Sequence, residues 1–208
     1  MPRTPPARVC AALLAAAALG MGGCGSSSTK TSAAPTGDFA GRVAGSQAFV
    51  AVVAGRAKVV AYVCDGRHGL AELFGGQRSG NRLALRNAHG ARLSATITPG
   101  RVTGAFAKAA GGSSLRFTAT PAHGHAGFFR ARGRIDHAPA TLGWIVLPDG
   151  AERGAATLGS RVVEAPALNV ATSTATLRGG GTLPAVRIST GSGSLTGQQG
   201  GQLGTFGG

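Results

Sequence analysis

The chain has 208 residues, enough for one domain with a substantial hydrophobic core. Lysine and arginine number 21 against 7 acidic residues, and the resulting net charge of +14 favours anionic partners such as lipid headgroups or cell-wall polymers. Aromatic residues make up only 5% of the chain, too few for the exposed ring platforms that bind sugars or single-stranded nucleic acid. We therefore expect no nucleic-acid partner. Because arginine, alanine and glycine have GC-rich codons, genome composition is an alternative origin of the arginine excess.

The beginning of the chain has the layout of an export signal. Arg3 and Arg8 precede an apolar stretch that starts at Val9 and ends in small residues. This stretch is shorter than the about 20 apolar residues that a membrane-spanning helix requires. We therefore interpret residues 1–23 as a signal peptide that is removed on export.

The signal peptide leads into Met21, Gly22, Gly23 and Cys24. This segment resembles the lipobox of bacterial lipoproteins, in which small residues precede a cysteine that is acylated and becomes the mature N-terminus. The resemblance covers residues 1–24 only. It implies export and a lipid anchor at Cys24 that holds the protein in the bacterial cell membrane, facing outside the cytoplasm, and it implies nothing about activity. The alternative is an ordinary signal peptide in which Cys24 is incidental.

A third cysteine remains after the other two are accounted for. Cys10 leaves with the signal peptide and Cys24 carries the lipid, so Cys64 has no partner for an intrachain disulfide. Its neighbours Tyr62 and Val63 are apolar, which predicts a buried and unreactive thiol rather than a redox centre.

Two segments lack apolar periodicity. Residues 24–39 are rich in Ser, Thr, Gly and Ala, and we interpret them as the lipidated N-terminus followed by a flexible linker. Residues 191–208 are rich in Gly, which predicts a disordered tail. A single domain is therefore expected over residues 40–190.

Within this domain, apolar residues alternate with polar ones, and turn residues interrupt the pattern about every ten residues. This indicates an antiparallel meander of about ten strands between residues 45 and 160, joined by tight hairpins. We predict an all-β fold and a small barrel, because closure removes exposed strand edges. A two-sheet β-sandwich is the alternative. Residues 162–188 are expected to pack along the outside of the domain.

Three segments are apolar on both faces, namely residues 49–53, 59–64 and 142–147. Such strands are covered on both sides, either by a second layer or by barrel contents on one face and another segment on the other. The alternating strands predict the following core positions: Leu83, Leu85, Leu93, Ile97, Val102, Phe106, Leu115 and Phe117.

The same alternation predicts a basic surface. Arginines next to inward-pointing core residues point outward from strands about 4.8 Å apart, close enough for one continuous patch. Guanidinium groups suit phosphate and carboxylate, so we expect them to contact polyanions. These residues are Arg82, Arg86, Arg92, Arg101 and Arg116. The alternative is that they are scattered solubilising charges.

Two acidic residues sit in similar settings. Asp65 and Asp149 each follow apolar residues and precede Gly, which suggests two hairpin turns or, alternatively, a paired-acid site. A second pattern is a row of arginines at period two, which we interpret as a solvated strand face: Arg130, Arg132 and Arg134.

Other chemical signals are weak. His123, His125 and His137 have spacings that loops can direct toward one metal ion, although the residues around them fit turns equally well. No Gly-x-Ser-x-Gly, Walker or His-Glu-x-x-His motif occurs. We therefore predict no catalytic, metal or cofactor-binding residue, and no cofactor.

The sequence thus predicts a membrane-anchored exported lipoprotein that acts as a non-enzymatic binding or envelope-interaction module. One alternative is a carrier of a small apolar ligand, in a barrel whose interior is left open by Ala95, Gly104 and Ala119. The other is an enzyme of unrecognised type that uses Asp65, Asp149 or the histidines.

Overall fold

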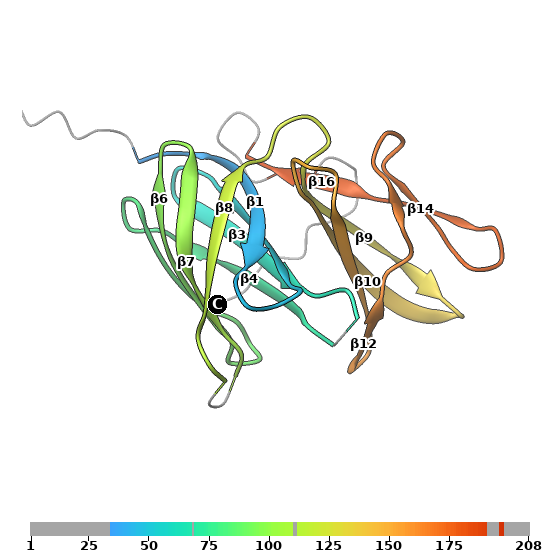
Figure 1. The fold of residues 1–208 in the computed structure, drawn as a ribbon. Coiled ribbons are helices and arrows are strands. Elements are labelled where there is room, and N and C mark those ends of the chain that lie inside the picture. The colour runs from blue at the N-terminus through green and yellow to red at the C-terminus, as the bar shows by residue number, and fades with distance from the viewer. Residues whose placement is uncertain (1–33, 68, 110–111, 191–195, 198–208) are drawn as a thin grey trace, which may run out of the picture. The chain divides into compact units, whose positions relative to one another are not determined.

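A computed structural model of the chain describes residues 34–67, 69–109, 112–190 and 196–197. The predicted signal peptide, Cys24, and most of the predicted linker and tail lie outside these residues. The described part of the chain is built from strands and contains no helix, so it also has no apolar helix long enough to cross a membrane (Figure 1).

The first eight strands form one antiparallel sheet in the order β4-β3-β2-β1-β8-β7-β6-β5. Because β1 pairs with β8, the sheet curls into a barrel whose sequential strands are neighbours. The barrel is nearly closed, since β4 and β5 form no ladder and only a bridge between Ser79 and Arg82 lies at their connection. The strands are β1 (Gly37–Val43), β2 (Phe49–Ala54), β3 (Lys58–Cys64), β4 (Ala71–Gln77), β5 (Arg82–Arg86), β6 (Arg92–Thr98), β7 (Arg101–Ala107) and β8 (Leu115–Pro121).

The remaining strands form two further antiparallel sheets. The second sheet has the order β12-β11-β10-β9-β16-β17, and the third has the order β13-β14-β15. Their members are β9 (Gly127–Ile135), β10 (Ala138–Val146), β11 (Glu152–Leu158), β12 (Arg161–Glu164), β13 (Leu168–Asn169), β14 (Thr174–Thr176), β15 (Thr182–Pro184), β16 (Val186–Ser189) and β17 (Thr196–Gly197).

The all-β fold and the barrel are confirmed. The strands between residues 45 and 160 are β2 to β11, but they divide between two sheets after β8, because β1 already occupies the free edge of β8. Strand β1 also begins before the predicted domain boundary at residue 40, because Phe39 is buried in the core. Within the predicted tail, β17 pairs with β16.

The barrel interior is filled with apolar side chains from all eight strands. The predicted core positions are buried there, except that Leu115 is half-buried against the same cluster. Across the interior, the rings of Phe74 and Phe106 meet edge to face with 6.2 Å between their centroids. Each such buried side chain contributes about 1.5–3 kcal/mol, so this interior is the main stabilising feature of the barrel.

The strands that are apolar on both faces are covered on both faces, as predicted. Val50 and Val52 of β2 point into the barrel, while Phe49 packs outside it in the cluster that β2 and β3 share with the second sheet. Ring stacking between Tyr62 of β3 and Phe128 of β9, at 4.9 Å, belongs to that cluster. Strand β10 is covered in the same way, by the barrel on one face and by the cluster shared with the third sheet on the other.

Candidate functional site

One half of the barrel carries no acidic residue. No Asp or Glu occurs between residues 73 and 135, an interval that contains β5 to β8 in full. Exposed basic residues are frequent on the same strands and at their ends. We call this surface the basic face and define it by Arg82, Arg86, Arg92, Arg101, Lys108 and Arg116.

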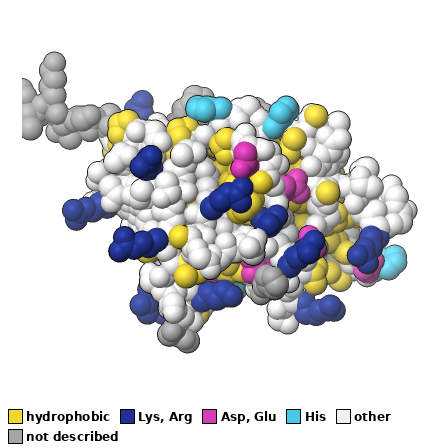
Figure 2. Space-filling model, viewed as in Figure 1, with side chains coloured by type: hydrophobic (Ala, Val, Ile, Leu, Met, Phe, Trp, Pro, Cys, Tyr) yellow, Lys and Arg dark blue, Asp and Glu magenta, His cyan; other side chains and the backbone are white. Residues whose placement is uncertain are grey.

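The basic side chains of this face are not neutralised by the fold. None of them forms an ion pair with another residue of the described ranges. Figure 2 shows the contrast: over β6 and β7 there are Lys and Arg side chains without acidic ones, whereas acidic side chains gather toward the second sheet. The charge of the basic face is therefore available to an external anion.

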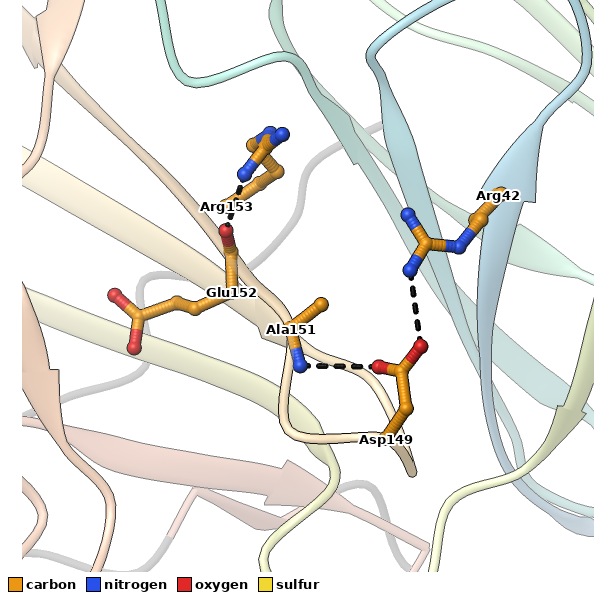
Figure 3. A network of polar contacts seen from close by, with 5 residues as sticks. All are labelled: Arg42, Asp149, Ala151, Glu152 and Arg153. Atoms are coloured by element: carbon orange, nitrogen blue, oxygen red, sulfur yellow. Dashed lines mark hydrogen bonds and ion pairs between the residues drawn. The ribbon is translucent and has the colours of Figure 1, made fainter.

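Two arginines outside the basic face form ion pairs within the protein. Arg42 of β1 contacts Asp149 at 2.9 Å, and Arg67 contacts Glu164 at 3.3 Å. Asp149 also accepts a hydrogen bond from the backbone N–H of Ala151 at 3.0 Å, as Figure 3 shows. This backbone hydrogen bond, followed by the one from Arg42, lowers the pKa of Asp149 and keeps it ionised.

The strand register divides the basic face. Arg86 and Arg92 lie directly opposite each other on β5 and β6. Arg82 lies opposite a threonine, and so does Arg101; Arg116 lies opposite an alanine. Arg101 lies opposite Thr98, which is six residues along β6 from Arg92, or about 20 Å along the strand. The structure therefore brings together Arg86 and Arg92 among the five predicted arginines and spreads the other three over the face.

Two hollows adjoin the arginines of this face. One has a volume of about 550 Å³ and is lined by Arg86 and Arg92, by other residues of β5 to β7 that include Leu85 and Leu93, and by Gly112 and Ser114. The other has a volume of about 490 Å³ and lies between β1, β8 and the turn that follows β10. Arg116 lines the second hollow together with Arg42 and Asp149. Arg42 is the only other basic residue in this lining, and its charge is already neutralised by Asp149.

The two Asp-Gly pairs are hairpin turns, which confirms one of the two predicted roles. Asp65 accepts a hydrogen bond from the backbone N–H of Leu70, and Asp149 accepts the one from Ala151. The following glycines have positive φ, 78° at Gly66 and 82° at Gly150, a conformation that glycine adopts without strain. Each aspartate thus has a structural role in its turn.

The three histidines that were weighed as metal ligands lie in exposed turns. His123 and His125 are in the connection between β8 and β9, and His137 is in the turn between β9 and β10. Within the described ranges, no group of three or more His, Cys, Asp or Glu residues is arranged to hold a metal ion.

The arginine row of β9 is solvated only in part. Arg132 and Arg134 are exposed as predicted, but Arg130 is half-buried. Burial, and then the charge of Arg132, lower the pKa of Arg130. The difference arises because Phe128, on the same face of β9, packs against the barrel and draws the adjacent part of the strand toward it.

Cys64 is buried, as predicted. It is 0% exposed, and its Sγ atom donates a hydrogen bond to the carbonyl oxygen of Arg153 at 3.5 Å. Burial is the largest cause of a strongly raised thiol pKa. The thiol is therefore protonated and shielded, which disfavours nucleophilic chemistry.

Side chains fill the part of the barrel interior that Gly104 borders. A Cβ atom added to Gly104 would lie 2.7 Å from the Cβ of Ala95 and 2.8 Å from Cζ of Phe117. The ring of Phe117 thus occupies the volume that Gly104 leaves, and Ala119 is itself fully buried. Gly104 thus accommodates the neighbouring ring of Phe117.

Lys108 and the pairing of Arg86 with Arg92 were not among the sequence expectations. The acid-free interval from residue 73 to residue 135 was a visible signal for Lys108, but the pairing of Arg86 with Arg92 depends on the register of β5 and β6.

No protein-family model matches the chain, and no curated protein or solved structure matches it either. The basic face is therefore the feature on which a functional proposal rests.

Proposed function

We propose that the protein is an exported lipoprotein, tethered through Cys24, whose β-domain is a non-enzymatic envelope-interaction module. In this proposal the basic face contacts the anionic lipid headgroups of the membrane that holds the tether. The observation that supports it is the set of exposed basic side chains on β5 to β8 that have no acidic partner among the described residues.

The expected affinity follows from the charge. A lysine or arginine close to an anionic membrane contributes about 1 kcal/mol, and the attraction falls off within a Debye length of about 8 Å at physiological salt. The side chains of the basic face alone are therefore expected to bind an anionic membrane weakly and in a salt-sensitive way. A lipid tether raises the effective concentration at the membrane, so weak contacts suffice for a stable orientation.

Vesicle binding tests the proposal. The full chain carrying Cys24→Ser, which cannot be acylated at that position, is mixed with phosphatidylglycerol vesicles and with neutral vesicles at low and moderate salt. We expect binding to the anionic vesicles that weakens as salt rises. Arg92→Glu combined with Arg116→Glu is expected to abolish it.

A matched control separates the face from the total charge. Arg161→Glu combined with Arg178→Glu changes the net charge by the same amount on exposed residues outside the basic face. This variant is expected to retain most of the binding. Absence of binding at low salt, or equal loss in both double variants, would contradict the proposal. Acidic cell-wall polymers carry similar groups, and binding to them alone would also contradict the membrane as the partner.

A further inference from the structure

Arg86 and Arg92 form a like-charge pair that the fold leaves uncompensated. They face each other directly across β5 and β6, and both are exposed. Their flanking residues Leu85 and Leu93 point into the barrel, so both guanidinium groups leave the same outer surface. Like charges directly opposite in a sheet destabilise it, and an anion bound between them would relieve the repulsion.

The pair borders a hollow that has room for such an anion and for a group attached to it. The hollow has a volume of about 550 Å³. Ala84 and Ala105 line it, and their short side chains leave the volume open. Ser94 and Ser114 also line it and supply hydroxyl groups. Cationic forks and hydroxyl groups are thus combined at one place.

We propose that Arg86, Arg92 and the hollow form a binding site for a phosphate ester of a small polyol. This inference rests on the proposed function, in which the same face contacts anionic headgroups, and it names the group that is recognised. A single guanidinium fork satisfies both oxygens of a carboxylate, whereas a phosphate monoester has a further terminal oxygen that a second fork can bind. The serine hydroxyls suit the hydroxyl groups of the polyol.

Such an ester occurs in soluble form as a monoester and in a phospholipid headgroup as a diester, and the experiment has an arm for each. The full chain carrying Cys24→Ser is titrated with glycerol 3-phosphate, inorganic phosphate and sodium chloride at matched ionic strength, while amide chemical shifts of β5 and β6 are followed. Binding is then measured to phosphatidylglycerol vesicles and to vesicles of equal charge made with a carboxylate-headed lipid.

We expect saturable shifts with glycerol 3-phosphate, a weaker response to inorganic phosphate and none that saturates with chloride. Arg92→Ala or Arg86→Ala should weaken glycerol 3-phosphate binding about tenfold or more. Arg92→Lys, which keeps the charge and loses the fork, should also weaken it. Arg82→Ala and Arg101→Ala remove the same charge outside the hollow and should keep the original affinity.

The outcomes separate this site from the proposed function. A response that is identical in chloride, or one that Arg101→Ala reduces as much as Arg92→Ala does, would overturn the site. Vesicle binding without a saturable glycerol 3-phosphate site would also overturn it, but would leave the proposed function intact. If the source is a lipid headgroup, Arg92→Ala reduces binding to phosphatidylglycerol vesicles more than to carboxylate vesicles. If glycerol 3-phosphate binds saturably but Arg92→Ala affects both kinds of vesicle equally, the natural ligand of the site is the soluble ester.

Discussion

Glu152 of β11 accepts a hydrogen bond from the backbone N–H of Leu168 at 3.1 Å. The contact joins the second sheet to β13, which starts the third sheet. Glu152 is half-buried, and burial raises its pKa despite this hydrogen bond. The folded protein therefore holds a carboxyl group that costs free energy to ionise.

The first prediction is that Glu152→Gln stabilises the protein at pH 7. Because the folded-state pKa is raised, the contribution of Glu152 to stability is fully present below the ordinary glutamate pKa and is lost as pH rises through the folded-state value. Gln keeps the oxygen that accepts from Leu168 and carries no charge. Thermal denaturation should show a higher melting temperature for the variant at pH 7 and no difference at pH 3. A lower melting temperature at pH 7 would show that ionised Glu152 is favourable.

Cys64 provides a test of the cluster between the barrel and the second sheet. The thiol is fully buried and has a raised pKa, so reaction with a thiol reagent requires local or global opening. In a chain with Cys10→Ser and Cys24→Ser, labelling should be slow in buffer and fast in denaturant. The rate in buffer should rise when the cluster is weakened by Phe128→Ala. Rapid labelling of the native chain would instead point to an accessible, reactive thiol.

Much of the local structure followed from the sequence. Alternation with period two is a property of each strand by itself, so it placed Leu93, Ile97 and Phe117 in the core correctly. The division after β8 is different, because it depends on β1 pairing with β8 across most of the barrel sequence. No local pattern reports such a pairing.

The candidate site shows the same limit. Outward-pointing arginines followed from alternation, but the meeting of Arg86 with Arg92 depends on the turn between β5 and β6. In that turn, Asn87 accepts a hydrogen bond from the backbone N–H of Ala91 at 3.0 Å, which closes the loop at the length that sets the register. With a loop one residue longer, different residues of β5 and β6 would lie opposite each other.

The pairing of β1 with β8 requires glycine at position 41, which no pattern in the sequence indicates. A Cβ atom added there would lie 1.9 Å from the carbonyl oxygen of Thr118 on β8. We expect Gly41→Ala to separate β1 from β8 and to cost about 3 kcal/mol or more. Gly181→Ala is the matched control, because its added atom would make only an ordinary contact at 3.9 Å with Leu177. Denaturant unfolding of both variants checks this, and equal midpoints would contradict the close approach.

The last prediction concerns the proposed tether at Cys24. Each buried methylene group contributes about 0.8 kcal/mol to membrane association, so one acyl chain binds reversibly, whereas two or three hold a protein essentially permanently. If Cys24 is acylated, the mature chain begins at that residue and partitions with membranes even at high salt, where the contribution of the basic face is screened. Mass spectrometry of the N-terminal peptide should show diacylated or triacylated Cys24. Cys24→Ser should move the protein to the soluble fraction at high salt, while Cys64→Ser should leave it in the membrane. An unmodified Cys24 in the mature protein would rule out the lipid anchor and leave the basic face as the proposed contact with the envelope.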